Sequence, residues 1–293
     1  MSLRLEMLQV ARLAPKLLEE ATERVADYLT SEFNPDGGVR DRAGQSDLYY
    51  TVFGLEGLIA LRRDPPAARV RTFLEGFGDG EGLDLVHLAC LARAWAALPR
   101  GSLPPDRARR IAERLLLHRA ADGGFASRAS AGGAVYPSFL AAGALQDLGC
   151  EIPDPDALAR SVASLQLPDG SFANEAGAPA GTTPTTAAAV TLLRRLGREP
   201  SPETARWLLE RAHPKGGFTA APGAPLPDLL STATALHALA ALKVSLAPIA
   251  ERTLDFLDTL WTGRAFCGTW ADPQPDSEYT YYALLSLGHL SLV

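Results

Sequence analysis

The chain has 293 residues and a net charge of −6. This acidic balance, with no basic stripe along the sequence, argues against nucleic-acid binding. No apolar run approaches the ~20 residues that a membrane-spanning helix needs. Three cysteines at unrelated spacings, Cys90, Cys150 and Cys267, predict no disulfide framework and favour a reducing compartment. The N-terminal segment has no long apolar core typical of a signal peptide, so we expect a cytoplasmic location.

A short phrase recurs along the chain: two small residues, mostly glycine, then an aromatic residue, a polar or proline-rich loop and an apolar helix. The clear neighbouring copies lie about 46 to 52 residues apart, a period typical of an array of supersecondary units. The last copy carries Trp270 at the aromatic position, and the second copy is degraded. The copies are 36–39, 80–83, 122–125, 169–172, 215–218 and 267–270.

The helices after these phrases align on one position, occupied mostly by threonine. Asp47, Asp84, Asp228 and Asp276 stand four residues before it, which is typical of N-caps that satisfy free N–H groups. The segment 186–193 has no polar face, so a helix there is buried on all sides. The aligned positions, which we call the anchor positions, are Thr51, Leu88, Ser138, Thr186, Thr232 and Thr280.

Amphipathic segments rich in Arg and Glu alternate with these apolar helices, and several have proline near their start, where a missing N–H costs little. The pattern predicts an all-α fold: an α6/α6 toroid of about twelve helices in six helix pairs, forming a single domain over 1–293. The inner helices should face a central cavity. A first helix over 5–30 should open the outer layer. The outer helices are expected at 13–30, 65–76, 104–119, 154–165, 200–211 and 246–260.

The repeated turns, the six-copy register and the final segment Asp276-Ser277-Glu278-Tyr279-Thr280-Tyr281-Tyr282-Ala283-Leu284 resemble the β subunits of protein prenyltransferases. More distantly, the chain resembles a domain of squalene and oxidosqualene cyclases, the terpene-cyclase side of the same superfamily. The resemblance covers nearly the whole chain. It implies the toroid fold and an isoprenoid ligand, whereas fold alone does not define a reaction.

The zinc site of the prenyltransferase family is not reproduced. The resemblance would place an aspartate and a cysteine at the start of the fifth inner helix and a histidine at the start of the last one. Here those positions hold Asp228, Leu230 and Tyr279. Asp228 is the only remnant, and it also suits an N-cap. We therefore expect no bound zinc and no other cofactor.

The groups that ionise a diphosphate or protonate an alkene are also missing. The family carries Arg and Lys in the loop before the fifth inner helix, and the corresponding loop, 219–227, contains no cation. An Asp-x-Asp-Asp cluster of the cyclase kind does not occur. Asp154-Pro155-Asp156 is nearest to it, but it begins an outer helix. A prenyltransferase or terpene cyclase would need non-standard chemistry here.

Residues two and one before the anchor, and two after it, are expected to look into the cavity. Repeats one and six are neighbours when the ring closes, so Tyr49, Tyr50, Phe53, Tyr279 and Tyr282 should form an aromatic wall suited to an isoprenoid chain. The same rings could instead simply fill the core. His237, on the fifth inner helix, is expected as packed core. The expected ligand-binding set is Tyr49, Tyr50, Phe53, Tyr136, Leu140, Ser231, Thr234, Tyr279 and Tyr282.

Two polar residues are candidate catalytic groups. Glu278 lies among tyrosines, where burial would raise its pKa and let it act as an acid. Alternatively, it is a first-turn glutamate that favours the helix dipole. His87 could pair with Asp84, or make only a local hydrogen bond at the helix start.

The sequence thus predicts a prenyltransferase-like or terpene-cyclase-like toroid that binds an isoprenoid or a similar elongated apolar molecule. Whether it is an enzyme stays open. The alternative is a catalytically inactive toroid that serves structure or protein interaction. A partner subunit or a homo-oligomer is compatible with either interpretation.

Overall fold

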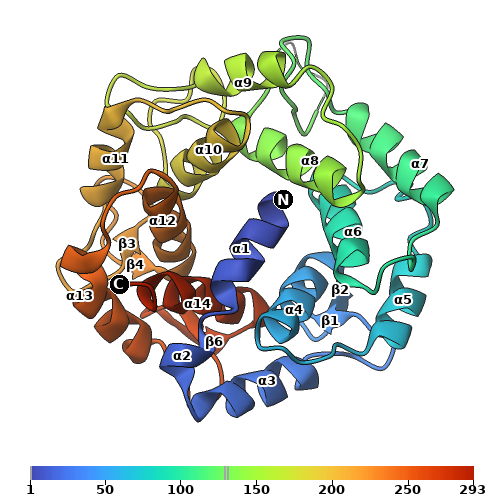
Figure 1. Cartoon of the computed structure of the whole chain (residues 1–293), viewed down its shortest axis with the longest axis horizontal. Helices are drawn as coiled ribbons and strands as arrows, with labels where there is room; N and C mark the ends of the chain where they lie inside the picture. The colour runs from blue at the N-terminus through green and yellow to red at the C-terminus, as the bar shows by residue number, and fades with distance from the viewer. Residues whose placement is uncertain (1, 129, 131) are drawn as a thin grey trace.

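The computed structural model describes residues 2–128, 130 and 132–293, whose helices form a closed double ring (Figure 1). The inner ring consists of α4 (Leu48–Ala60), α6 (Leu85–Ala97), α8 (Val135–Asp147), α10 (Thr183–Arg195), α12 (Leu229–Ala241) and α14 (Ser277–Leu290). The outer ring consists of α3 (Ala21–Ser31), α5 (Ala67–Glu75), α7 (Pro105–Leu116), α9 (Pro155–Ala163), α11 (Pro202–Leu209) and α13 (Ala247–Thr259). The predicted α6/α6 toroid is confirmed.

The inner helices begin where the cap pattern predicts. The Asp47 carboxylate accepts hydrogen bonds from the backbone N–H groups of Tyr49 and Tyr50, at 2.8 and 3.1 Å. Asp84, Asp228 and Asp276 cap α6, α12 and α14 in the same way. Each cap satisfies N–H groups that have no partner within the helix.

The repeated phrase and the anchor position are joined by a hydrogen bond. The Thr232 hydroxyl accepts from the N–H of Phe218 at 2.9 Å, and Thr186 does the same for Phe172 at 3.0 Å. The glycines allow close packing: Gly216 has a φ of 91°, and a Cβ there would lie 1.8 Å from the carbonyl oxygen of Arg252. Only glycine adopts this φ without strain and leaves this space.

The assignment of the last phrase to 267–270 is corrected. The anchor Thr280 hydroxyl accepts from the N–H of Phe266, at 3.3 Å, so Phe266 and not Trp270 occupies the aromatic position. Trp270 instead packs edge-on against Phe256, with ring centroids 5.5 Å apart. The sequence misled because Cys267-Gly268-Thr269 imitates the phrase four residues too late.

In the part of the chain that the structure describes, three short antiparallel hairpins connect outer helices to inner ones. They pair β1 (Val39–Arg40) with β2 (Ser46–Asp47), β3 (Phe218–Thr219) with β4 (Pro227–Asp228), and β5 (Cys267–Thr269) with β6 (Asp272–Pro275). In the first two hairpins, the pairs Val39–Asp47 and Phe218–Asp228 place the phrase beside the capping aspartate. The turn and the start of the inner helix are therefore fixed together.

The ring closes by packing α14 against α4, the first and last inner helices. The Ser277 hydroxyl donates to the carbonyl oxygen of Tyr50 at 3.3 Å, and the rings of Phe53 and Tyr282 lie 5.5 Å apart. The expected contact between repeats one and six is therefore present. No helix in the described part of the chain is both long and apolar enough to cross a membrane.

The expectation of a continuous first outer helix over 5–30 is wrong. The segment breaks into α1 (Leu3–Ala11), α2 (Pro15–Leu18) and α3, and α1 lies inside the inner ring (Figure 1). Pro15 opens α2, and Glu19 after it has a positive φ of 46°, which ends the helix. Leu3, Met7, Leu8 and Ala11 of α1 are buried, because they face the surrounding inner helices rather than water.

Candidate functional site

A cavity of about 470 Å³ lies within the inner ring, in the size range typical of small-molecule sites. The residue two positions after the anchor lines the cavity on all six inner helices. This regularity follows from the repeat, since equivalent positions on equivalent helices point the same way. These six residues are Phe53, Cys90, Leu140, Ala188, Thr234 and Tyr282.

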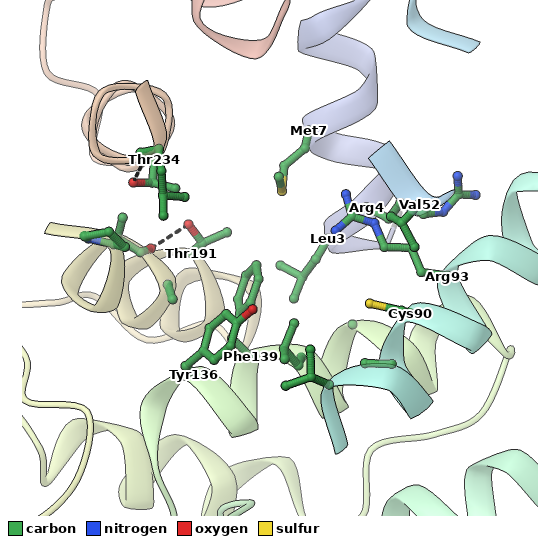
Figure 2. A pocket seen from close by; sticks show the side chains of 18 of the residues that line it. Leu3, Arg4, Met7, Val52, Cys90, Arg93, Tyr136, Phe139, Thr191 and Thr234 are labelled. Carbon is green, nitrogen blue, oxygen red and sulfur yellow. Dashed lines mark hydrogen bonds between the residues drawn. The ribbon is translucent and has the colours of Figure 1, made fainter. Parts of the chain in front are cut away.

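The cavity has a rim and a floor. Its rim lies where the inner helices begin and includes Tyr49, Tyr136 and Leu230; the Tyr136 side chain is 40% exposed there. Its floor is helix α1, which contributes Leu3, Arg4 and Met7, and Figure 2 shows Leu3 and Met7 reaching between the opposite walls. The cavity is therefore bounded by the partly exposed Tyr136 at the rim and by α1 at the floor.

One side of the cavity is aromatic. Tyr49 packs edge-on against Phe53, with ring centroids 4.9 Å apart. Phe53 also packs against Tyr282, with ring centroids 5.5 Å apart. We call Tyr49, Phe53 and Tyr282 the aromatic face. Three of the five residues expected for the aromatic wall therefore lie on the cavity. Tyr136 and Leu140 approach it from α8.

Tyr50, Ser231 and Tyr279 are not among the residues that line the cavity. They occupy the position one before the anchor, which points about 100° away from the preceding residue. Ser231 instead completes the cap of α12, its hydroxyl donating to Asp228 at 2.7 Å. Tyr279 packs against the backbone of Gly268, with the Arg42 guanidinium 5.6 Å from its ring centroid.

Glu278 is hydrogen-bonded to the aromatic face but is not among the residues that line the cavity. The Tyr49 hydroxyl, which belongs to a lining residue, donates to Glu278 Oε1 at 2.5 Å. Burial raises the pKa of Glu278 to about 7, although the Tyr49 hydrogen bond opposes this rise. At neutral pH, the Glu278 carboxyl group is therefore protonated in about half of the molecules. It lies next to the Tyr49 hydroxyl, which belongs to the cavity wall.

His87 makes local contacts at the start of α6. Its Nδ1 lies 2.8 Å from Asp84 Oδ1, and its Nε2 lies 3.9 Å from Asp47 Oδ2. Its side chain is 39% exposed and does not line the cavity. Because α4 lies between α6 and α14 in the ring (Figure 1), the structure does not bring His87 and Glu278 together.

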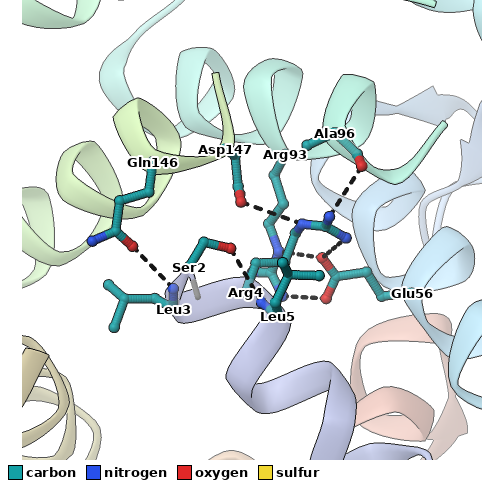
Figure 3. A network of polar contacts seen from close by, with 9 residues as sticks. All are labelled: Ser2, Leu3, Arg4, Leu5, Glu56, Arg93, Ala96, Gln146 and Asp147. Carbon is teal, nitrogen blue, oxygen red and sulfur yellow. Dashed lines mark hydrogen bonds and ion pairs between the residues drawn. The ribbon is translucent and has the colours of Figure 1, made fainter. Parts of the chain in front are cut away.

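A buried ionic network closes the floor (Figure 3). Arg93 donates to both carboxylate oxygens of the fully buried Glu56, at 2.7 and 2.5 Å. Arg4 of α1 donates to Asp147 at 3.3 Å and to the carbonyl oxygen of Ala96 at 3.0 Å. Burial raises the pKa of Asp147 to about 6, while Arg4 and Arg93 oppose the rise. Two cations thus balance two carboxylates at neutral pH.

These charged groups lie one helical turn beyond the positions that the sequence predicts to line the cavity. Three residues beyond Phe53, Cys90, Leu140, Ala188, Thr234 and Tyr282 come Glu56, Arg93, Gly143, Thr191, His237 and Leu285, and all but Glu56 line the cavity. A charged residue in the third turn of an otherwise apolar helix, as at Glu56 and Arg93, was the available signal. Arg4 and Asp147, separated by 143 positions, carried no pairing signal.

The zinc positions implied by the resemblance lie near the rim. Asp228 caps α12, Leu230 contributes an apolar side chain to the cavity, and Tyr279 points elsewhere. Within the described residues, no three His, Cys, Asp or Glu side chains are grouped so that they could hold a metal ion.

The model of the prenyltransferase alpha-alpha toroid domain matches residues 10–89, 85–192 and 182–292, nearly the whole chain. The chain belongs to this family. The prenyltransferase toroid is thus established from sequence as well as from the helix arrangement. A search of curated protein sequences finds no match.

Solved structures show the same fold at low sequence identity. Candida albicans protein geranylgeranyltransferase-I complexed with GGPP has a TM-score of 0.70 and 16% identity, over 91% of this chain and 90% of that one. A type II terpene cyclase from Scytonema, complexed with geranylgeranyl dihydroxybenzoate, gives 0.63 and 14%, over 95% and 97%. A protein from Actinoplanes gives 0.64 and 17%, over 94% and 99%.

Proposed function

We propose that this prenyltransferase toroid binds an elongated apolar ligand of the isoprenoid class in its central cavity. The observation that carries the proposal is the form of the cavity: a pocket of about 470 Å³ inside a ring of helices, with an aromatic face and a floor formed by α1. The similar structures with GGPP and with a geranylgeranyl substrate are consistent with this ligand class.

The energetics suit such a ligand without a charge contact. Full burial of a farnesyl-sized chain is worth up to ~10 kcal/mol at about 0.8 kcal/mol per methylene, before association costs of several kcal/mol. Among the described lining residues, the cations are Arg4 and Arg93, and both are occupied by buried carboxylates. A diphosphate would lose its hydration and gain no free cation in the cavity.

Calorimetric titration with farnesol, geranylgeraniol and their diphosphates tests the proposal. We expect micromolar binding of the alcohols and no tighter binding of the diphosphates. A diphosphate preference of a hundredfold or more would overturn this form of the proposal in favour of ordinary prenyltransferase chemistry. Absence of binding for all four compounds would favour a toroid that serves structure or protein interaction.

A proton-initiated conversion of the ligand is a second candidate. It is favoured by the Glu278 carboxyl, with its pKa of about 7, hydrogen-bonded to Tyr49 on the cavity wall. About half of such groups carry a proton at pH 7, and the group is a weak acid. Mass-spectrometric detection of a product from geranylgeraniol, lost in Glu278→Gln, would support this; an unchanged ligand would exclude it for that substrate.

The three cysteines are free in the structure, which supports a reducing, cytoplasmic location for the protein. The net charge of −6 disfavours binding of nucleic acid. A partner subunit or self-association remains compatible with the outer ring.

A further inference from the structure

One residue that lines the cavity carries a polar atom with no hydrogen-bond partner among the described residues. Five buried side-chain polar atoms in the described residues lack a hydrogen bond, and one of them, His237 Nε2, belongs to a lining residue. The residue His237 is only 6% exposed. A buried polar atom of this kind costs free energy unless something bonds to it.

The other ring nitrogen of His237 is fixed from outside the cavity. His237 Nδ1 lies 3.0 Å from His289 Nε2 of α14, with the two rings 5.2 Å apart. One nitrogen of this pair must carry the shared proton, so Nε2 of His237 is either a lone-pair acceptor or an N–H donor. Burial lowers the pKa of His237 to about 4, so the ring is neutral at physiological pH and does not attract an anion.

Two threonines on the same side of the cavity offer acceptor oxygens. The Thr234 hydroxyl, one turn before His237 on α12, donates to the carbonyl of Leu230 at 2.7 Å. The Thr191 hydroxyl on the neighbouring α10 donates to Ala187 at 2.8 Å. Their protons are thus used within their helices, while their oxygens retain lone pairs. Figure 2 shows both threonines facing the cavity, opposite Cys90 and Arg93.

We infer that His237, with Thr191 and Thr234, forms a binding site for a neutral hydroxyl group carried by the apolar ligand. A hydroxyl is both donor and acceptor, so it can satisfy Nε2 in either tautomer and also donate to a threonine oxygen. His237 follows the cap Asp228 by nine residues, which places it about 14 Å along the helix from the rim. The ligand therefore enters with its hydroxyl end first and leaves its chain along the aromatic face.

This inference rests on the proposed apolar-ligand function, and one comparison separates the two. The dissociation constants of farnesol and of the same hydrocarbon with hydrogen in place of the hydroxyl are measured on wild type, His237→Leu and His237→Gln. The ratio of the two dissociation constants is then compared between the proteins. Because the free ligands are the same in every measurement, their hydration free energies cancel in this comparison. Leu140→Val, a change on the cavity wall without a polar atom, is the control.

We expect the preference for farnesol to fall by about tenfold or more in His237→Leu, the scale of one buried hydrogen bond. His237→Gln, which keeps a donor and an acceptor, should retain much of the preference. Leu140→Val should weaken both ligands alike. If both ligands bind and the ratio is unchanged in His237→Leu, the hydroxyl site is overturned while the apolar-ligand function stands. If neither ligand binds wild type, both proposals fail.

A measurement on the unaltered protein covers the case in which His237→Leu does not fold. In protein with ¹⁵N-labelled histidine, the Nε2 resonance of His237 should move when farnesol binds and stay nearly fixed when the hydrocarbon binds. Bound farnesol that leaves this resonance in place would overturn the inference without any substitution.

Discussion

At the scale of single side chains, Glu278 is a carboxyl group whose protonation is coupled to folding. Burial raises its pKa from an ordinary value of 4.5 to about 7. The native protein therefore binds this proton more tightly than the unfolded chain does. The stability that Glu278 contributes is complete below pH 4.5 and is lost as the pH rises through 7.

Glu278→Gln keeps a hydrogen-bonding group beside Tyr49 but cannot ionise. As the pH rises from 4.5 to 7, we therefore expect the free energy of unfolding of Glu278→Gln to increase relative to that of wild type. Urea denaturation of both proteins across this range measures the difference. Parallel stability curves would show that Glu278 titrates as an exposed glutamate.

The aromatic face is expected to supply a large part of the binding energy. Phe53→Ala and Tyr282→Ala should each weaken geranylgeraniol binding by on the order of 1–3 kcal/mol, the scale of one buried aromatic side chain. Tyr50→Ala is the matched control, because Tyr50 neighbours the face but does not line the cavity. Equal losses in all three variants would mean that binding does not occur at the cavity.

At the scale of elements, helix α1 decides the shape of the site. Gly288 of α14 allows α1 to pack closely against α14. A Cβ at this position would lie 2.0 Å from the carbonyl oxygen of Val10, a backbone atom that could move away only if α1 shifted. Gly143 of α8 is a contrasting case, because a Cβ there would meet only Leu3 Cδ1, at 3.9 Å. Both glycines lie within inner helices, so alanine raises helix propensity at each site.

We therefore expect opposite signs for one substitution. Gly143→Ala should stabilise the protein by about 0.5–1 kcal/mol, whereas Gly288→Ala should destabilise it and loosen α1. Thermal unfolding measures the first effect, and limited proteolysis near the N-terminus measures the second. Two variants of similar stability and proteolytic resistance would place α1 outside the ring.

The placement of α1 also shows where prediction from sequence ends. The inner helices follow from local signals, namely the capping aspartates and the turn glycines. The capping aspartates predict the first residues of α4, α6, α12 and α14. Pro15 signalled a break in the first segment, but nothing local says that the piece before it turns inward. The pairing of Arg4 with Asp147 exists only after the ring has closed.

The repeat predicts the lining of the cavity only for the first two turns of the inner helices. The positions two after the anchor, from Phe53 to Tyr282, all line the cavity. The positions one before the anchor do not line the cavity, apart from Thr185. A residue about 100° around the helix from a lining residue points toward the neighbouring helices instead of the cavity. The contact of His237 Nδ1 with His289, which leaves Nε2 as the nitrogen without a partner, is not revealed by any sequence spacing.

At the scale of the whole molecule, stability depends on ring closure. Helix α14 packs against α12, α4 and α1 at once. A chain ending at Val244, without α13 and α14, would expose the apolar faces of α4 and α12 and lose one wall of the cavity. We expect it to show no cooperative thermal transition. A sharp transition in this truncated chain would show that the repeats fold as an open array.

The central claim is that the cavity holds an elongated apolar ligand, and a crystal structure with saturating geranylgeraniol tests it most directly. We predict one chain per protein between the aromatic face and the floor formed by Leu3 and Met7, with its hydroxyl near His237. An empty cavity at saturating geranylgeraniol, or a chain bound only on the outer ring, would contradict the account.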